Sequence, residues 1–175
     1  MTELDILHSI QNMHTPLFDA VMPFISSLGN VGLIWIVISI VLLFGRRTRQ
    51  CGVMILISMF LCLLFGNGFL KNAICRERPC WIDSTVKLLI AVPKDYSFPS
   101  GHTMHGFAAA TIIYLHHKRA GMLALVLAAL IAFSRIYLFV HYQTDILGGL
   151  CIGVLMSLFV YKMWNLAARK YRNRI

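Results

Sequence analysis

The residues with the clearest chemical potential lie between two long apolar runs, in the stretch Ser134–Asp145. Arg135, His141 and Asp145 are ionisable groups where the neighbouring sequence would place them in a bilayer. A charge at the bilayer centre costs at least about 2.5 kcal/mol, so such residues mark functional sites by default. His141 and Asp145 are four residues apart, which puts them on one face of a helix. A carboxylate beside an imidazole fixes its tautomer and makes its far nitrogen more basic, as a catalytic histidine requires.

Two further clusters of charged or reactive side chains precede this stretch. The first begins at Lys71 and contains Arg78, and the second is the tetrapeptide Pro99–His102. Lys71, Arg78 and Arg135 are cations without an obvious carboxylate partner at a matching position, so they favour an anion with several oxygens. A phosphate fits this requirement. The second cluster opens a helix with a glycine, and such an N-terminus offers free backbone N–H groups to the same anion.

Two histidines are suited to act on a bound phosphate. His141, backed by Asp145, can serve as the nucleophile, and His102 can serve as the general acid. The other five histidines are interpreted as surface or packing residues, although His105 lies one turn from His102 and could line the same pocket. Arg76 is interpreted as a surface arginine that extends toward lipid headgroups.

The composition is that of an integral membrane protein. Hydrophobic residues make up 58% of the chain and charged residues 13%, whereas soluble domains carry about 25% charged residues. A length of 175 residues suits one helical bundle, so we expect a single membrane-embedded domain over residues 1–175. The acidic N-terminus, Met1–Asp5, lacks the positive region of a signal peptide, and none is expected. Cys75 and Cys80 flank the arginine cluster and could form a disulfide.

The apolar runs predict an all-α bundle with about five transmembrane helices. Each run is near the ~20 residues that a helix needs to cross a membrane. Residues 16–28 are expected to form an interfacial helix. The alternatives are that these residues belong to the first span, or that the chain has six spans. Residues 71–99 are expected to form an outer-face loop that holds a short surface or re-entrant helix over residues 86–92. The expected spans are residues 28–44, 51–70, 101–116, 120–140 and 146–164.

Two local features of these helices can be predicted. Arg135 and His141 are six residues apart, which is about 240° around an ideal helix, so they cannot share a face. If both meet one phosphate, the helix must end or bend around residues 138–141. Gly149 and Gly153 form a pair of small residues four apart, which is typical of close helix packing.

The distribution of charge predicts the orientation of the helices. Basic residues lie at 46–49, 118–119 and 169–174, on one side of the five crossings, whereas all seven acidic residues lie on the other side. By the positive-inside rule the basic side is cytoplasmic, so the N-terminus and the three reactive clusters face outward. This arrangement brings the clusters together at one membrane depth. It also explains the net charge of +9 without a nucleic-acid partner.

The three clusters resemble the signature of the type 2 phosphatidic acid phosphatase superfamily, which also includes glucose-6-phosphatases and vanadium haloperoxidases. That signature is a lysine, six residues and Arg-Pro, then Pro-Ser-Gly-His, then Ser-Arg, five residues, histidine, three residues and aspartate. Lys71 with Arg78-Pro79, the complete Pro99–His102, and Ser134-Arg135 with His141 and Asp145 match all three parts.

The resemblance implies a role for each matched residue. His141 would attack phosphorus and form a phosphohistidine, Asp145 would orient it, and His102 would protonate the leaving oxygen. The resemblance implies no metal ion or other cofactor. The phosphate oxygens would be held by Lys71, Arg78, Ser100, Gly101 and Arg135.

A site at the outer headgroup level, in a chain without a soluble domain, favours a lipid phosphate or diphosphate that arrives sideways from the bilayer. The partners are thus the substrate and membrane lipids. Bacterial members of the resembled family often hydrolyse undecaprenyl pyrophosphate and so recycle the carrier of cell-wall synthesis, and we expect this substrate, in an inner or plasma membrane. Phosphatidylglycerophosphate, phosphatidic acid and lipid A are alternatives.

Two other classes remain as alternatives to a phosphatase. A non-catalytic lipid-phosphate binding or transport protein could use the same cations, but transporters typically show paired half-repeats, and none is found in this sequence. A vanadate-dependent oxidase is disfavoured, because those relatives are mainly soluble whereas this composition is that of a membrane protein.

Overall fold

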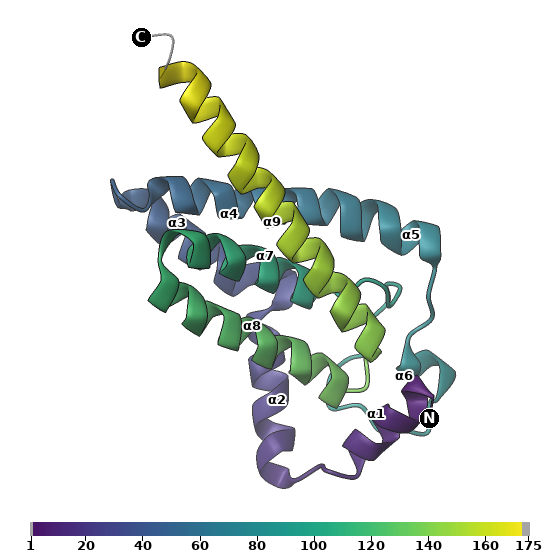
Figure 1. Cartoon of the computed structure of the whole chain (residues 1–175). Helices are drawn as coiled ribbons and strands as arrows, with labels where there is room; N and C mark the ends of the chain where they lie inside the picture. Colours follow the sequence, from purple (N-terminus) through teal and green to yellow (C-terminus); the bar gives the residue numbers. More distant parts are fainter. Residues whose placement is uncertain (1, 173–175) are drawn as a thin grey trace.

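The computed structural model describes residues 2–172, and the secondary structure in this range is entirely helical (Figure 1). The predicted all-α class is thereby confirmed for these residues. Residue 1 and residues 173–175, which end the basic tail, lie outside the described residues. In chain order the elements are α1 (Glu3–Gln11), α2 (Pro16–Leu28), the 3-10 turn η1 (Asn30–Gly32), α3 (Leu33–Phe44), α4 (Arg49–Cys62), the π-helical segment η2 (Leu63–Leu70), α5 (Lys71–Ile74), α6 (Pro79–Ile82), α7 (Gly101–His116), α8 (Lys118–Tyr137) and α9 (Gln143–Arg172).

Several helices are long and apolar enough to cross a membrane. Three helical runs, residues 49–82, 118–137 and 143–170, meet this criterion alone, and α2 with η1 and α3 forms a fourth as a pair bent by 45°. Length and hydropathy thus account for up to four of the five predicted spans. The fifth, α7, has 16 residues, about 24 Å of helix. The chain is a multi-pass membrane protein.

α7 lies at the centre of the bundle, between α4, α8 and α9 (Figure 1). Most of its residues are buried, including Ala108–Ala110, so α7 is an interior helix. α9 can approach it because Gly149 and Gly153 lack side chains. A Cβ added at Gly149 would lie 2.7 Å from the carbonyl oxygen of Ser100, and one at Gly153 would lie 2.4 Å from that of Met104. The predicted packing role of the two glycines is confirmed.

The connection between α8 and α9 contains the predicted break. α8 ends at Tyr137 and α9 begins at Gln143, so Arg135 and His141 belong to different segments. Phe139, between them, has a φ of 57°, in the left-handed region that non-glycine residues rarely adopt. The predicted interruption around residues 138–141 is confirmed, and it frees His141 from the helical phase of Arg135.

Residues 71–99 are not a loop throughout, which corrects the expectation from sequence. The long helix continues through α5 to Ile74, and Cys75, with a φ of 50°, ends it before the short helix α6. The helix expected over residues 86–92 is wrong, because residues 83–100 contain no helix. So short a segment is a poor isolated helix. Its side chains Val86, Leu88 and Ile90 pack instead against the cluster around Phe139. All five cysteines, including Cys75 and Cys80, are free thiols.

The N-terminal residues form two helices. α2 has the bounds expected for the interfacial helix, residues 16–28, and its bent junction with α3 also fits the alternative that it belongs to the first span. α1 was not predicted. It is stabilised by a capping box, in which the Thr2 hydroxyl accepts from Asp5 N–H while the Asp5 carboxylate accepts from Thr2 N–H.

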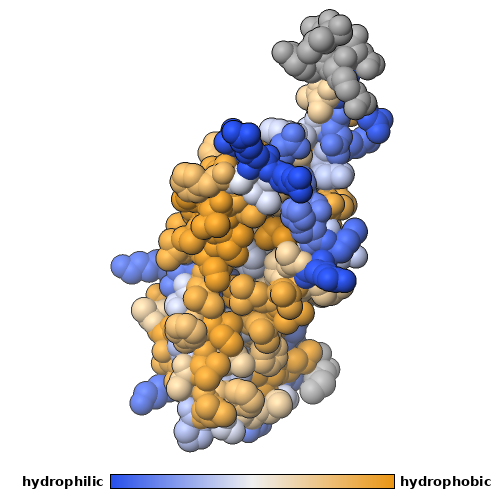
Figure 2. All heavy atoms as spheres, turned by 90° about the vertical axis from the view of Figure 1, so that its left-hand side faces the viewer, coloured by the Kyte–Doolittle hydropathy of each residue, from blue (hydrophilic) through white to orange (hydrophobic). Residues whose placement is uncertain are grey.

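The outer surface carries many large apolar side chains, as lipid contact requires. Figure 2 shows a broad apolar area over one face of the molecule, with hydrophilic residues mainly at its margins. Exposed apolar side chains occur on several long helices, for example Phe44 on α3, Phe60 on α4, Leu123 on α8 and Leu155 on α9.

Candidate active site

One cavity of about 770 Å³ brings most of the predicted site residues together. They come from the end of the α4–α5 run, the segment before α6, the first turn of α7, the last turn of α8 and the α8–α9 connection. Ser100 and Asp145 lie fully buried beside them. His105 also lines the cavity. This outcome matches the alternative interpretation of His105 as a pocket residue. The predicted residues that line it are Lys71, Arg78, Gly101, His102, Arg135 and His141.

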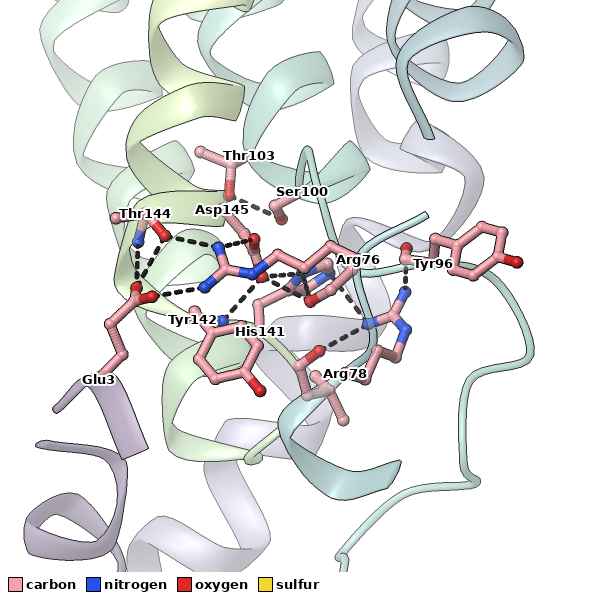
Figure 3. A network of polar contacts seen from close by, with 12 residues as sticks. Glu3, Arg76, Arg78, Tyr96, Ser100, Thr103, His141, Tyr142, Thr144 and Asp145 are labelled. Carbon is pink, nitrogen blue, oxygen red and sulfur yellow. Dashed lines mark hydrogen bonds and ion pairs between the residues drawn. The ribbon is translucent and has the colours of Figure 1, made fainter. Parts of the chain in front are cut away.

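His141 lines this cavity. It lies beside Asp145 in the network of polar contacts (Figure 3). His141 Nδ1 lies 3.3 Å from Asp145 Oδ2. The same carboxylate oxygen accepts hydrogen bonds from Ser97 Oγ at 2.5 Å and from the backbone N–H of Tyr142 at 2.8 Å. Asp145 occupies the first turn of α9, where a carboxylate also interacts favourably with the helix dipole. The carboxylate is thus held by groups from two segments.

The hydrogen bonds of His141 assign its tautomer. Nε2 lies 3.2 Å from Arg78 Nη1, and because a guanidinium can only donate, Nε2 must accept. The proton therefore sits on Nδ1, facing Asp145. Burial lowers the pKa of His141 well below its ordinary value, and the charges of Arg78, Arg135 and Lys71 lower it further. His141 is therefore a neutral imidazole with its lone pair directed at the cations, which is the form a nucleophile needs.

Arg135 is buried and has spare donor capacity. Its Nη1 donates to Ser26 Oγ on α2 at 2.6 Å. Its Nε is buried and has no hydrogen-bond partner among residues 2–172. A buried donor without a partner is costly, so this nitrogen suits an anion in the cavity.

Lys71 and Arg78 have a carboxylate partner that the sequence analysis did not identify. Asp95, from the segment between α6 and α7, forms ion pairs with both Lys71 and Arg78. The expectation that these two cations lack carboxylate partners was wrong, because the segment folds back over the cavity. Burial opposes ionisation of Asp95, but the hydrogen bond and charge of Lys71 and the charge of Arg78 outweigh it and lower its pKa to about 2.

His102 is positioned from two sides. It lies in the first turn of α7, whose N-terminal Ser100 receives a hydrogen bond from Thr103 Oγ1 at 3.0 Å and donates its backbone N–H to the Asp145 carbonyl at 3.1 Å. On the other side, His102 Nε2 lies 3.0 Å from Asn30 Oδ1. The bend between α2 and α3 therefore reaches the cavity and contacts the candidate general acid.

Arg76 differs most from its predicted role. It was expected to extend toward headgroups, but its guanidinium forms ion pairs with Glu3 and with Asp145.

The sequence also did not identify Ser97, Asn30 and Asp95 as partners of the site residues. One signal could have indicated acidic partners, since all seven acidic residues were expected on the same side of the membrane as Lys71, Arg78 and Arg135. Within residues 2–172, no cluster of three or more His, Cys, Asp or Glu side chains is arranged to hold a metal ion.

Comparison with known proteins identifies the family of this chain. The model of the PAP2 superfamily matches residues 49–169. The undecaprenyl-diphosphatase of Sulfolobus acidocaldarius is 31% identical over 140 residues, which cover 79% of this chain and 67% of that protein. The lipid A 4'-phosphatase of Porphyromonas gingivalis is 27% identical over 97% of this chain and 75% of its own length. The crystal structure of a transmembrane PAP2-type phosphatidylglycerolphosphate phosphatase from Bacillus subtilis superposes with a TM-score of 0.76, at 29% identity, over 93% of this chain and 84% of that one. The chain therefore belongs to the PAP2 superfamily and is a phosphatase of the hydrolase class.

Proposed function

We propose that this chain is a metal-independent lipid phosphate phosphatase that works through a phosphohistidine intermediate. The observation that carries the proposal is the buried, neutral His141, with Nδ1 facing Asp145 and Nε2 facing Arg78 at the wall of a cation-lined cavity. Phosphoryl transfer needs a positioned nucleophile and preorganised positive charge, because negative charge is spread over the three oxygens of the transferred group.

In the first step, the lone pair of His141 Nε2 forms a bond to phosphorus while the bond from phosphorus to the leaving oxygen breaks. His102 donates a proton to that oxygen, so the lipid leaves as an alcohol, or as a lipid phosphate when the substrate is a diphosphate. The phosphate oxygens are held by the cations and by the N-terminus of α7 at Ser100 and Gly101. Arg135 Nε, without a partner among the described residues, supplies one donor.

In the second step, a water molecule attacks phosphorus and His102, now unprotonated, accepts a proton from it. The electrons of the phosphorus–nitrogen bond return to His141 Nε2, and inorganic phosphate leaves. Asp145 keeps the Nδ1 proton in place through both steps, so Nε2 stays the reactive nitrogen. Each residue ends the cycle in its starting protonation state.

The shape of the cavity supports a lipid substrate. From the cations it continues to apolar side chains of α4 and η2, including Met59, Phe60 and Leu63. Phe60 and Leu63 are exposed on the outer surface of the bundle, so a hydrocarbon chain can lie along them while its headgroup reaches His141. The similarity to the Sulfolobus acidocaldarius enzyme supports undecaprenyl diphosphate as the substrate. Phosphatidylglycerophosphate, phosphatidic acid and lipid A are the alternatives.

The orientation follows from charge. The chain forms one domain that crosses an inner or plasma membrane five times, with α2 and α3 as a bent first crossing. The turns before α4 and before α8 lie at the opposite end of the bundle from α5 and α6 (Figure 1). These turns hold Arg46, Arg47 and Lys118, so the positive-inside rule places them in the cytoplasm and the cavity on the extracytoplasmic side.

The test is phosphate release from a panel of undecaprenyl diphosphate, phosphatidylglycerophosphate, phosphatidic acid and lipid A, in detergent with a chelator present. Wild type should release phosphate from at least one lipid. His141→Ala should abolish release, and His117→Ala, at the other end of α7, should not. Reactions with a substrate that carries a radiolabelled phosphate, quenched in alkaline denaturant, should trap an alkali-stable, acid-labile phosphoprotein in wild type and in His117→Ala, but not in His141→Ala.

Release that requires magnesium would overturn the metal-independent mechanism. Binding of a lipid without release from any member of the panel would instead favour a lipid-phosphate binding or transport protein. Release by His141→Ala at the wild-type rate would exclude the phosphohistidine.

A further inference from the structure

Arg76 connects the N-terminal helix to the carboxylate behind His141 (Figure 3). Its Nη1 donates to Asp145 Oδ1 at 2.8 Å and to Thr144 Oγ1 at 2.6 Å, and its Nη2 forms an ion pair with Glu3. The guanidinium also lies over the ring of Tyr142, 4.1 Å from the centroid. Four residues therefore hold this one side chain, which does not line the cavity.

Asp145 depends on Arg76 for the orientation of its second oxygen. The side chain of Asp145 is fully buried. Its Oδ2 accepts from Ser97 Oγ and Tyr142 N–H and faces His141 Nδ1, while its Oδ1 accepts from Arg76. A buried carboxylate that loses a charged donor either rotates or stays partly unsatisfied. Either change alters the group that orients His141.

Glu3 extends the network onto α1. One of its oxygens pairs with Arg76, and the other accepts from the backbone N–H of Thr144 at 3.2 Å and from its hydroxyl at 2.7 Å. Burial opposes ionisation of Glu3, but hydrogen bonds from Thr144 and Arg76 outweigh it and lower its pKa. Glu3 therefore places a negative charge at the N-terminus of α9, where free N–H groups and the helix dipole favour one.

The rest of α1 packs on the connection that carries His141. Leu7 is fully buried in a cluster with Phe139 and Val140. At the end of the helix, Gln11 Nε2 donates to the carbonyl oxygen of Tyr137 at 2.9 Å. α1 thus contacts the end of α8, the connection and the start of α9, so Glu3 is presented to Arg76 by a docked element.

We infer that Arg76 is a positioning residue for Asp145, and that Glu3 on α1 holds Arg76 in place, so that α1 is part of the active-site architecture. The inference rests on the proposed function, because the role of Arg76 is exerted through the His141–Asp145 pair. It gives the N-terminal residues a task in catalysis in addition to packing.

A positioning role and a purely structural role differ in their effect on pH dependence. Removal of the Arg76 charge leaves Asp145 uncompensated, which stabilises protonated His141 and raises its pKa. Because the nucleophile must be neutral, the acid limb of kcat/KM should move to higher pH. A loss of folded protein would lower activity equally at every pH. A variant that lacks the Arg76 charge keeps the other charged groups around His141 and Asp145. These groups are Lys71, Arg78, Arg135, Asp95 and Glu3.

The experiment compares Arg76→Gln, Arg76→Lys, Glu3→Gln and the double variant Arg76→Gln/Glu3→Gln, with Glu77→Gln as control. Arg76→Gln should lower kcat by about 10- to 100-fold, the usual cost of losing a supporting partner. KM should change little, because Arg76 does not line the cavity. Arg76→Lys should restore the wild-type acid limb and part of kcat. The double variant should be no worse than Arg76→Gln, because Glu3 acts through Arg76.

The substrate is the panel lipid that wild type hydrolyses fastest, and folded protein is quantified by size-exclusion chromatography in detergent. An inactive wild type would overturn the proposed function itself. An active wild type with an unshifted acid limb in Arg76→Gln would overturn the positioning role alone. If Arg76→Gln does not fold, the inference is tested with Arg76→Lys and Glu3→Gln instead. A wild-type kcat in both of these variants would also overturn it. A loss in Glu77→Gln equal to that in Glu3→Gln would overturn the role of Glu3.

Discussion

The carboxylate of Asp95 forms an ion pair with Lys71 inside the candidate phosphate site, although the Asp95 side chain is 58% exposed and that of Lys71 only 7% exposed. The same carboxylate pairs with Arg78. A solvated acid therefore neutralises two buried cations in the position that a phosphate oxygen would take. On the proposed mechanism, substrate therefore has to displace Asp95 or share these two cations with it.

Asp95→Asn should therefore bind phosphate more tightly. Loss of a competing charged partner worth about 1.4 kcal/mol corresponds to about tenfold in affinity. Inhibition by inorganic phosphate and by orthovanadate should both strengthen by about this factor. The melting temperature of the variant should fall in phosphate-free buffer and recover when phosphate is added, because the anion then neutralises the two cations.

The control is Asp83→Asn, which removes an acid of the same segment that pairs with His8 instead. Its inhibition constants should match those of wild type. Weaker inhibition of Asp95→Asn by phosphate would mean that Asp95 assists anion binding.

The activity of wild type should persist at mildly acidic pH. The pKa of His141 lies well below its ordinary value because of burial and the neighbouring cations. Because its pKa is lowered, the His141 imidazole stays neutral, and therefore nucleophilic, as the pH falls. kcat/KM for phosphatidic acid, corrected for the ionisation of the lipid measured by phosphorus NMR, should stay level from about pH 7.5 to about pH 6. An acid limb centred above neutral pH would contradict the neutral His141.

Asn30→Ala should affect proton donation by His102. Asn30 Oδ1 lies 3.0 Å from His102 Nε2, so its loss leaves the ring less well oriented. General acids contribute about 100- to 10,000-fold when the leaving group is poor, so the variant should lose about tenfold on phosphatidic acid. It should lose much less on p-nitrophenyl phosphate, whose leaving group needs no proton. The exposed Asn72→Ala is the matched control, and equal losses on both substrates would argue against a role in proton donation.

Leu63→Trp should separate chain binding from chemistry. Leu63 lines the apolar part of the cavity and is exposed toward the bilayer. A larger side chain there should raise KM for undecaprenyl diphosphate several-fold and leave hydrolysis of p-nitrophenyl phosphate unchanged. Leu123→Trp, on the exposed face of α8, should change neither. Equal effects of the two variants on the lipid would indicate that the chain does not lie against Leu63.

The helix break shows what the sequence can predict about this site. A spacing of six residues places Arg135 and His141 on different faces, so a common ligand demands an interruption between them. The structure has this interruption at Phe139. The prediction succeeds because helical geometry fixes the angle between residues that are close in the chain.

The partners of the site residues could not be predicted in the same way. Glu3 meets Arg76 across 73 residues and Thr144 across 141 residues. No periodicity relates positions so far apart, and a single arginine near a membrane surface has an ordinary explanation in headgroup contact. Asp95 and Ser97 lie in a segment without regular structure, so no helical phase assigns their side chains to a face.

The distance along the chain between Glu3 and Thr144 also determines when the enzyme becomes competent during synthesis. α1 leaves the ribosome before α9, because Thr144 in the first turn of α9 is made 141 residues after Glu3. Contacts of such long separation form late, since the loop between them must close first. On the proposed mechanism, a nascent chain that has inserted the helices before α9 has the candidate phosphate-binding cations without Asp145, so we expect hydrolysis only once α9 is in place.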